Sequence, residues 1–418
     1  MYPILKWATD IFPYNRSLTG NGNLKTLNYI KKINKNIIIK NFETGKKVFD
    51  WNIPKEWNVK DAYFLDSKNK KYCDFKKNNL HLLGYSIPIN KIVSKKILLE
   101  HIYSDKNQKN AIPYVTSYYH KNWGFCMSEN EKKKLKGKKF KVKIFSTLKK
   151  GKMHYGEAIL KGKSNKEIFF STYICHPSMA NNETSGICVA NAILKYISEN
   201  YQYRKYSYRF VFLPETIGSI SYIHKNLKKL KKNIIAGFNI SCVGDERAYS
   251  IINSRNENTL ADFALLSAIR DKKNFKKYSF LERGSDERQY CSVGVDLPVV
   301  GFCRSKYGSY PEYHTSLDNF KVVTEKGLND SFDIMKNIVD VFEAGHLPKA
   351  RYICEPQLSK RNLYPKISRR DNKVKIIRDL IAYSDGKTSI FENCIKFNCS
   401  LKDLFNSYKI LKKNNLLY

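Results

Sequence analysis

One segment of this chain places a histidine and a carboxylate just after an apolar run. Residues 168–170 predict a buried strand that ends near His176, and residues 186–199 predict an apolar helix. Asn182 and Glu183 lie in the turn between these two elements. Enzymes of the α/β class build metal and ligand sites from side chains at the carboxyl ends of strands. The segment therefore predicts a metal-binding turn, and the alternative interpretation is a capped helix with a surface histidine.

A glutamate occupies the equivalent position after a second apolar run. Residues 208–213 predict a strand, Glu215 follows it, and residues 218–228 predict the next helix. A carboxylate at such a strand end can act as a general base, because burial near a metal-bound water raises its pKa. The alternative is a glutamate that only stabilises the N-terminus of the helix through the helix dipole.

Two later segments carry further polar side chains. Asp286 lies between glycine and arginine residues, where it could orient a ligand, bind a substrate amine or form only a salt-bridged turn. His314 lies in a tyrosine-rich turn and offers a second ligand histidine, with Asp318 and Asn319 available to fix its loop. Taken alone, a histidine in such a turn is more often a structural residue than a ligand.

The four segments together predict a catalytic zinc site. The chain has only eight histidines, and two of them lie at predicted strand ends of one sheet. Zinc accepts imidazole and carboxylate ligands in a tetrahedral shell, and a water completes the shell in catalytic sites. Glu215 could take a proton from that water, which would then attack an amide carbonyl.

The elements that must position these residues alternate between strand and helix. This pattern predicts an α/β fold with a mixed sheet and helices on both faces. The strands are expected at residues 140–145, 167–173, 208–213, 234–241 and 298–302, and the helices at residues 186–199, 218–228 and 328–342.

The flanking regions differ from this core. Short aromatic and β-branched runs at residues 61–65 and 81–87 predict a small β-rich subdomain, and the charged residues 129–139 predict a loop. An amphipathic stretch over residues 24–33 predicts a helix near the start. After a linker at about residues 348–370, three helical periods resemble a helix-turn-helix or winged-helix unit. They cover residues 373–383, 390–397 and 401–412, the last with Ser400 as its N-cap.

The composition excludes several classes of protein. The chain has 418 residues and no apolar stretch of about 18 residues, so we expect no membrane span. Its first residues lack the layout of a signal peptide, and its ten cysteines are scattered singly, which predicts a cytoplasmic protein with reduced thiols. The net charge of +37 raises the possibility of nucleic-acid binding. The basic residues are mostly lysines spread along the whole chain, so we favour an AT-rich genome as the cause.

Long motifs along the chain resemble a known bacterial family. It is an aminopeptidase-like family related to zinc exopeptidases such as leucyl aminopeptidases and glutaminyl cyclases, in a branch described as polysaccharide biosynthesis proteins with an aminopeptidase-like domain. Besides the His176 segment, the motifs that carry the resemblance are residues 16–20 (RSLTG), 50–57 (DWNIPKEW), 112–119 (IPYVTSYY), 123–126 (WGFC), 214–219 (PETIGS), 285–291 (SDERQYC) and 313–316 (YHTS). The resemblance implies a core of residues 1–48 and 143–347, an inserted β-rich domain at 49–142 and a winged-helix-like domain at 360–418.

The resemblance also implies roles for individual residues. His176 and His314 match zinc-binding histidines, Glu215 matches the general base, and Asp286 matches an aspartate near the substrate. The bridging aspartate of the superfamily falls at or next to Asn182.

The ligand glutamate that normally follows the base is replaced by Thr216. We therefore expect one zinc ion rather than two, held by His176, by Glu183 or Asn182, and by His314.

Two hypotheses about function follow. The first is a zinc-dependent aminopeptidase or amidase that acts on a small peptide or on an amino-acylated intermediate of glycan biosynthesis. The alternative is a catalytically altered protein that binds a ligand or regulates through its winged-helix-like tail. We expect no membrane partner and no nucleic-acid partner, and a homo-oligomer is compatible with the sequence.

Overall fold

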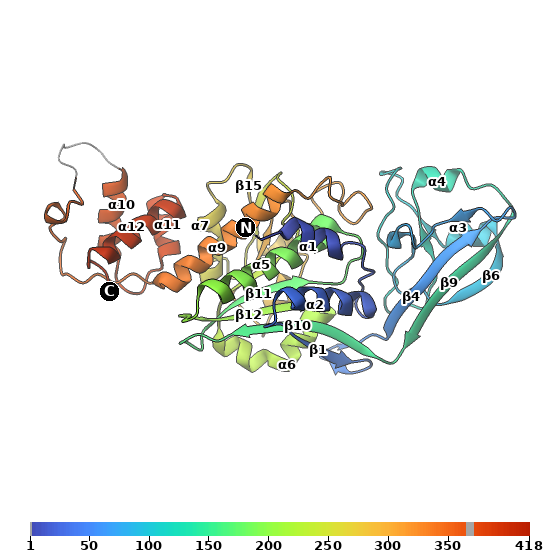
Figure 1. Ribbon diagram of the computed structural model, residues 1–418, viewed down its shortest axis with the longest axis horizontal. Coiled ribbons are helices and arrows are strands. Elements are labelled where there is room, and N and C mark those ends of the chain that lie inside the picture. The colour runs from blue at the N-terminus through green and yellow to red at the C-terminus, as the bar shows by residue number, and fades with distance from the viewer. Residues whose placement is uncertain (1, 365–371) are drawn as a thin grey trace.

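The computed structural model describes residues 2–364 and 372–418. Three regions follow one another along its longest axis (Figure 1), with a central α/β core between a β-rich region and a C-terminal helical unit. Among the described residues, no helix combines the length and the apolar character needed to cross a bilayer.

The core is built on a mixed sheet of eight strands. From one edge to the other, the strands are β1 (Ile38–Glu43), β10 (Lys152–Leu160), β12 (Ser207–Leu213), β11 (Glu167–Tyr173), β13 (Ile234–Ile240), β16 (Val299–Cys303), β14 (Tyr249–Ile252) and β15 (Phe275–Tyr278). The central strands β12, β11, β13 and β16 are parallel to one another. Their carboxyl ends therefore meet at the same edge of the sheet.

Helices cover both faces of this sheet, as the sequence predicts. One face carries α1 (Ile4–Ile11), α2 (Asn21–Ile33), α5 (Ser185–Asn200), α7 (Leu260–Ile269) and α9 (Glu325–Gly345), and the other carries α6 (Ile217–Asn233) (Figure 1). The strand β11 shows why two faces are needed. Phe170 packs into the core cluster beneath α5, and its neighbour Phe169 packs into the cluster beneath α6. Successive strand side chains point to opposite faces, so this fully buried strand needs cover on both.

A second, antiparallel sheet forms the β-rich region. Its strands, in order, are β5 (Lys71–Tyr72), β4 (Glu56–Leu65), β9 (Lys139–Lys149) and β6 (Ile89–Ser94). Shorter elements surround it: β2 (Lys47–Val48), β3 (Trp51–Asn52), η1 (Asn79–His81), α3 (Lys95–Glu100), β7 (Ile102–Tyr103), β8 (Phe125–Cys126) and α4 (Glu129–Lys133). The predicted limits of the three regions stay predictions.

The C-terminal unit packs against the core through its own apolar helices. It consists of α10 (Asn372–Ala382), α11 (Ile390–Phe397) and α12 (Leu401–Lys413). Ser400 caps α12 by accepting a hydrogen bond from the backbone of Asp403, as predicted. The side chain of Arg270, which follows α7, donates to the backbone oxygens of Ile395 and Cys399 and so links this unit to the core. The predicted linker falls partly on residues 365–371, which lie outside the described residues.

Two predictions for the β-rich region are wrong. The run at residues 81–87 forms only isolated bridges, at Leu82 and Gly84, because η1 ends at His81 and Tyr85 has a positive φ of 65°. The expected loop at residues 129–139 contains α4, which begins with a capping box formed by Ser128 and Glu131. The strands β1, β10, β14 and β15 of the large sheet were not predicted from the sequence, and the strand expected at residues 140–145 is β9 of the antiparallel sheet instead of a core strand.

Candidate metal and catalytic site

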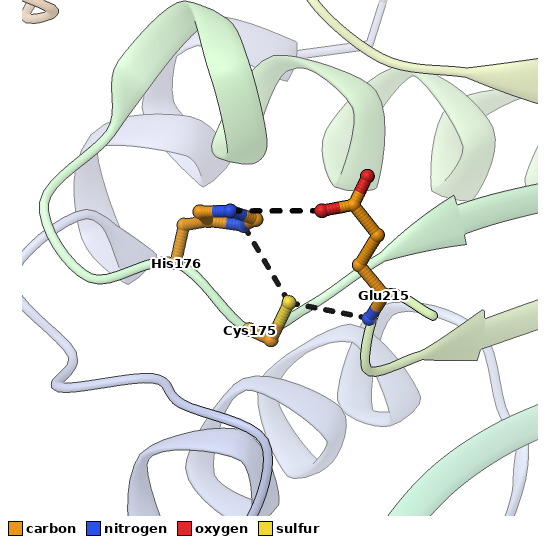
Figure 2. Close-up of side chains that lie close together, drawn as sticks. All are labelled: Cys175, His176 and Glu215. Carbon is orange, nitrogen blue, oxygen red and sulfur yellow. Dashed lines mark hydrogen bonds and ion pairs between the residues drawn. The ribbon is translucent and has the colours of Figure 1, made fainter. Parts of the chain in front are cut away.

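The predicted site residues gather at the carboxyl edge of the parallel strands. His176 follows β11, and Glu215 follows the neighbouring strand β12. The two side chains approach each other, with His176 Nε2 3.7 Å from Glu215 Oε2, and Cys175 lies beside them (Figure 2). Because β11 and β12 are adjacent and parallel, their ends bring together His176 and Glu215, which are 39 positions apart in the sequence.

A cleft of about 370 Å³ opens over these residues. The core contributes His176, Glu215 and His314 to its lining. The β-rich region contributes an aromatic wall, which is made of Trp51, Tyr114, Tyr118 and Tyr119. The cleft therefore lies between the two regions, with the polar groups on the core side.

His176 is held from behind by buried charged residues. Its Nδ1 lies 2.8 Å from Glu183 Oε2, and the other oxygen of Glu183 lies 3.3 Å from Nε of Arg16. Nε of Arg16 also donates to the backbone oxygen of His176 at 3.0 Å. Because Nδ1 is occupied by Glu183, Nε2 of His176 is the nitrogen that faces the cleft and Glu215.

Burial sets the protonation of this group. Desolvation, with the nearby charge of Arg16, lowers the pKa of His176 to about 3. Desolvation also raises the pKa of Glu183 to about 8, although Arg16 opposes that rise. The imidazole is therefore neutral at pH 7, which is the form that binds metals.

His314 also lines the cleft and lies in a turn with a left-handed backbone conformation. Its φ is 55°, and its ring centroid lies 5.2 Å from that of His176 and 5.2 Å from that of Tyr114. Burial, together with His176, lowers the pKa of His314 to about 3. Its Nε2 is buried without a hydrogen-bond partner among the described residues. The backbone of Tyr114 donates to the His314 oxygen at 2.8 Å, so the β-rich region fixes this loop.

The loop of Glu215 is held by Asp286. Oδ1 of Asp286 accepts hydrogen bonds from the backbone of Thr216 at 2.8 Å and from Ser219 Oγ at 2.7 Å. Thr216 has φ 64° and ψ −77°, a costly conformation for a β-branched residue that persists only where its surroundings fix it. Burial and then the charge of Asp286 raise the pKa of Glu215 to about 8. Asp286 thus acts on the candidate base through both geometry and charge.

Asn182 and Glu183 face different surroundings. Asn182 donates from Nδ2 to the Tyr173 hydroxyl at 2.8 Å, and its Oδ1 is buried without a partner among the described residues. Its backbone donates to Asp318. Glu183 is fully buried behind His176, and neither residue is among those that line the cleft. The ligand roles of Asn182 and Glu183 stay predictions.

The ligand atoms of Cys175, His176 and Glu215 lie within 4.8 Å of one another, which fits a bound metal ion, and the expected single zinc ion stays a prediction. The imidazoles of His176 and His314 are neutral at pH 7, and His176 Nε2 lies 3.7 Å from Glu215 Oε2. Nε2 of His314 and Oδ1 of Asn182 are buried without a hydrogen-bond partner among the described residues, and their roles as metal ligands stay predictions. Cys175 is a poorer candidate, because burial raises the pKa of its thiol well above the ordinary value and zinc binds the thiolate. Its Sγ instead accepts a hydrogen bond from the backbone of Glu215 at 3.2 Å.

Three residues of this site have no role that the sequence predicts. Arg16 and Tyr114 lie in motifs that carried the family resemblance, and Cys175 precedes His176. Nothing in the local pattern indicates that Arg16 pairs with Glu183 or that Tyr114 contacts both histidines. Their place in shared motifs was the signal available.

The chain matches a family model described as a domain of unknown function, DUF4910, over residues 5–345. The chain belongs to this family. A second model, described as a winged helix-turn-helix, matches residues 347–418, the stretch that contains α10, α11 and α12. The predicted winged-helix-like tail is therefore confirmed.

Known proteins support the same assignment. A protein of Clostridium acetobutylicum, provisionally named a polysaccharide biosynthesis protein with aminopeptidase-like domain, is 40% identical over 364 residues, which are 86% of this chain and 82% of that protein. A crystal structure from the same organism, provisionally described as a peptidase, has a TM-score of 0.91 at 36% identity, covering 99% of this chain and 95% of that one. The zinc aminopeptidase BSAP from Bacillus subtilis has a TM-score of 0.58 at 12% identity, covering 82% of this chain and 95% of its own. The family resemblance is thus confirmed, and the chain has the zinc aminopeptidase fold.

Proposed function

We propose that this protein is a zinc-dependent, aminopeptidase-like hydrolase that cleaves an amide bond in a small peptide or in an amino-acylated sugar of polysaccharide biosynthesis. The observation that carries the proposal is the approach of His176 Nε2 to Glu215 Oε2, at 3.7 Å, in a cleft that His314 completes. The name of the Clostridium relative supports the link to polysaccharide biosynthesis.

His176 and His314 would hold the ion through Nε2, and Asn182 is the third candidate donor. Zinc, when bound, polarises a carbonyl and makes a water more acidic. Glu183 keeps Nδ1 of His176 engaged and so fixes the direction of Nε2. We therefore assign Glu183 to orienting the ligand, in the manner of the carboxylate partners that zinc-binding histidines commonly have.

Glu215 is the general base of this proposal. Glu215 lines the cleft, and its raised pKa of about 8 lies close to working pH, where a base is most effective. It would accept the proton of the attacking water and return it to the leaving amine. Asp286 positions this carboxylate through Thr216, and it does not line the cleft itself.

Metal content tests the first half of the proposal. The purified full chain, desalted and analysed by plasma mass spectrometry, should contain about one zinc per chain. His176→Gln and His314→Gln should each lose the ion. His224→Gln is the matched control, because His224 is exposed on α6 and should leave the zinc content unchanged. Equal metal content in all four proteins would contradict the assignment of the ligands.

Replacement of the base tests the second half. Glu215→Gln should keep the zinc and lower kcat by about 10²–10⁴-fold, because an amide cannot accept the proton. Turnover is measured on a panel of aminoacyl 4-nitroanilides and aminoacylated hexosamines. Glu246→Gln, at an exposed glutamate outside the cleft, is the matched control and should keep full activity. Unchanged turnover in Glu215→Gln would refute the role of the base.

A further inference from the structure

One positive charge in the cleft, that of Arg288, forms no ion pair among the described residues, although it lies near enough to Glu215 and Asp286 to oppose the rise that burial causes in the pKa of both carboxyl groups. Arg288 is the single lysine or arginine among the described residues that line the cleft. Among those residues, no carboxylate lies within ion-pair distance of its guanidinium, since none of the ion pairs includes it. Its Nε is buried without a hydrogen-bond partner. Burying part of a guanidinium with an unpaired donor costs free energy, and a bound anion would offset that cost.

The position of Arg288 relative to the base is fixed. Its NH2 group donates to Thr216 Oγ1 at 2.5 Å, and Thr216 directly follows Glu215. The same strained loop therefore carries the candidate base and anchors the guanidinium. An anion bound by Arg288 would lie close to the bond that Glu215 acts on.

Carboxylate is the anion that suits this arrangement. A guanidinium fork binds a carboxylate through two parallel hydrogen bonds, and one bond to Thr216 leaves the remaining donors free. The neighbouring walls are aromatic and uncharged, with Trp51 39% exposed and Tyr119 48% exposed. The Tyr119 hydroxyl donates to the backbone oxygen of Asn52 at 3.2 Å, which fixes this wall beside Trp51. These faces can pack against the rest of a substrate and add no competing charge.

We infer that Arg288 is a specificity residue that binds a carboxylate group of the substrate close to the scissile amide. The inference rests on the proposed function and narrows it to acidic substrates. Two sources of this group are compatible with the cleft: the carboxylate of an amino acid and the carboxylate of a sugar acid.

Calorimetric binding to matched probes tests the inference. The first pair is N-acetyl-L-alanine and its amide, and the second is N-acetylmuramic acid and N-acetylglucosamine. All titrations use the full chain with Glu215→Gln, so that no probe is turned over. The acid of at least one pair should bind about tenfold more tightly than its neutral partner. The pair that shows the preference identifies the source of the carboxylate.

Substitution at position 288 must remove this preference. Arg288→Met should bring the acid and neutral probes of a pair to within about twofold, and Arg288→Lys should keep part of the difference, because lysine retains the charge without the fork. Arg283→Met is the matched control, since Arg283 is exposed and outside the cleft, and it should leave the preference intact. Thermal melting checks that each variant is folded.

Three results would overturn the inference: no preference for the acid in either pair, no binding of any probe at millimolar concentration, or a preference that survives Arg288→Met. An active hydrolase without the preference would overturn this inference alone. A protein that prefers acids but hydrolyses no amide would overturn the proposed function alone.

Discussion

Two buried arginines of this protein lie in networks of opposite character. Arg209 lies on strand β12 and makes four hydrogen bonds, two to Glu167 at 2.5 and 2.8 Å, one to Glu157 at 3.0 Å and one to the Tyr222 hydroxyl at 2.7 Å. Arg16 lies behind His176, and its NH2 group has no partner among the described residues. Both side chains are almost completely buried.

The carboxyl groups beside these two arginines have pKa values that are shifted in opposite directions. Burial alone would raise the pKa of Glu157, but hydrogen bonds from Lys40 and Tyr222 and the charge of Arg209 lower it below its ordinary value. Burial raises the pKa of Glu183 to about 8, although Arg16 lies next to it. A fully satisfied network keeps its charges and stabilises the sheet, whereas an incompletely satisfied one keeps protonation states that can change. We therefore assign a functional role to the network of Arg16 and Glu183, and a structural role to the network of Arg209.

The largest effect is expected from breaking the satisfied network. Arg209→Met leaves the carboxylate of Glu167 buried without its ion-pair partner, while Glu157 keeps Lys40 and Tyr222, and it should lower the free energy of unfolding by about 3–5 kcal/mol. Arg16→Met should cost less, about 1–3 kcal/mol, because Glu183 can remain protonated and the main loss is hydrogen bonds to backbone oxygens. Urea unfolding of the metal-free proteins measures both values. Equal decreases in the free energy of unfolding would contradict the distinction between a satisfied and an incompletely satisfied network.

The next effect separates zinc binding from stability. Glu183→Gln keeps the size of the side chain but weakens the hold on Nδ1 of His176, so zinc affinity should fall by about 10–100-fold. Competition with a chelating dye measures the affinity. Glu167→Gln is the matched control at a buried glutamate of the other network, and it should change the stability without changing the zinc affinity. If Glu183→Gln left the zinc affinity unchanged and Glu167→Gln lowered it, Glu183 would have no role in zinc binding.

The positions of the strand ends could be predicted because they depend on local pattern. The run before His176 is fully buried in β11, and the run before Glu215 is fully buried in β12, so each appears in the sequence as a short apolar segment with a polar residue after it. Parallel neighbours place such ends together. The fold class and the central residues of the site follow from these two facts.

The surroundings of these residues could not be predicted, because they depend on distant contacts. Arg16 contacts the backbone of His176 across 160 positions, and Tyr114 reaches His314 from an inserted region. Asn182 and Glu183 are neighbours in the π-helical turn over Ala180–Thr184, where successive side chains point in different directions. The sequence could place both in the turn, but only the packing shows that Glu183 lies behind His176.

The smallest effect concerns pH, and it contrasts Asp286, which lies beside the candidate base, with Glu157 of the satisfied network. Glu215 must be ionised to act as a base, so kcat/KM should rise with pH through its pKa. Asp286 has a pKa raised by burial to about 6, so it is negative in the range where Glu215 titrates and disfavours ionisation of Glu215. Asp286→Asn keeps an oxygen for the Thr216 backbone but removes this charge.

The rising limb of the pH profile should therefore move about one unit toward lower pH in Asp286→Asn. A bound cation lowers the pKa of Glu215 in both proteins, so the shift between them is the quantity to measure. Glu157→Gln should leave the limb in place, because that carboxylate belongs to the satisfied network and does not act on Glu215. A limb that stays fixed in Asp286→Asn, or moves toward higher pH, would show that Asp286 supports the loop without setting the charge state of the base.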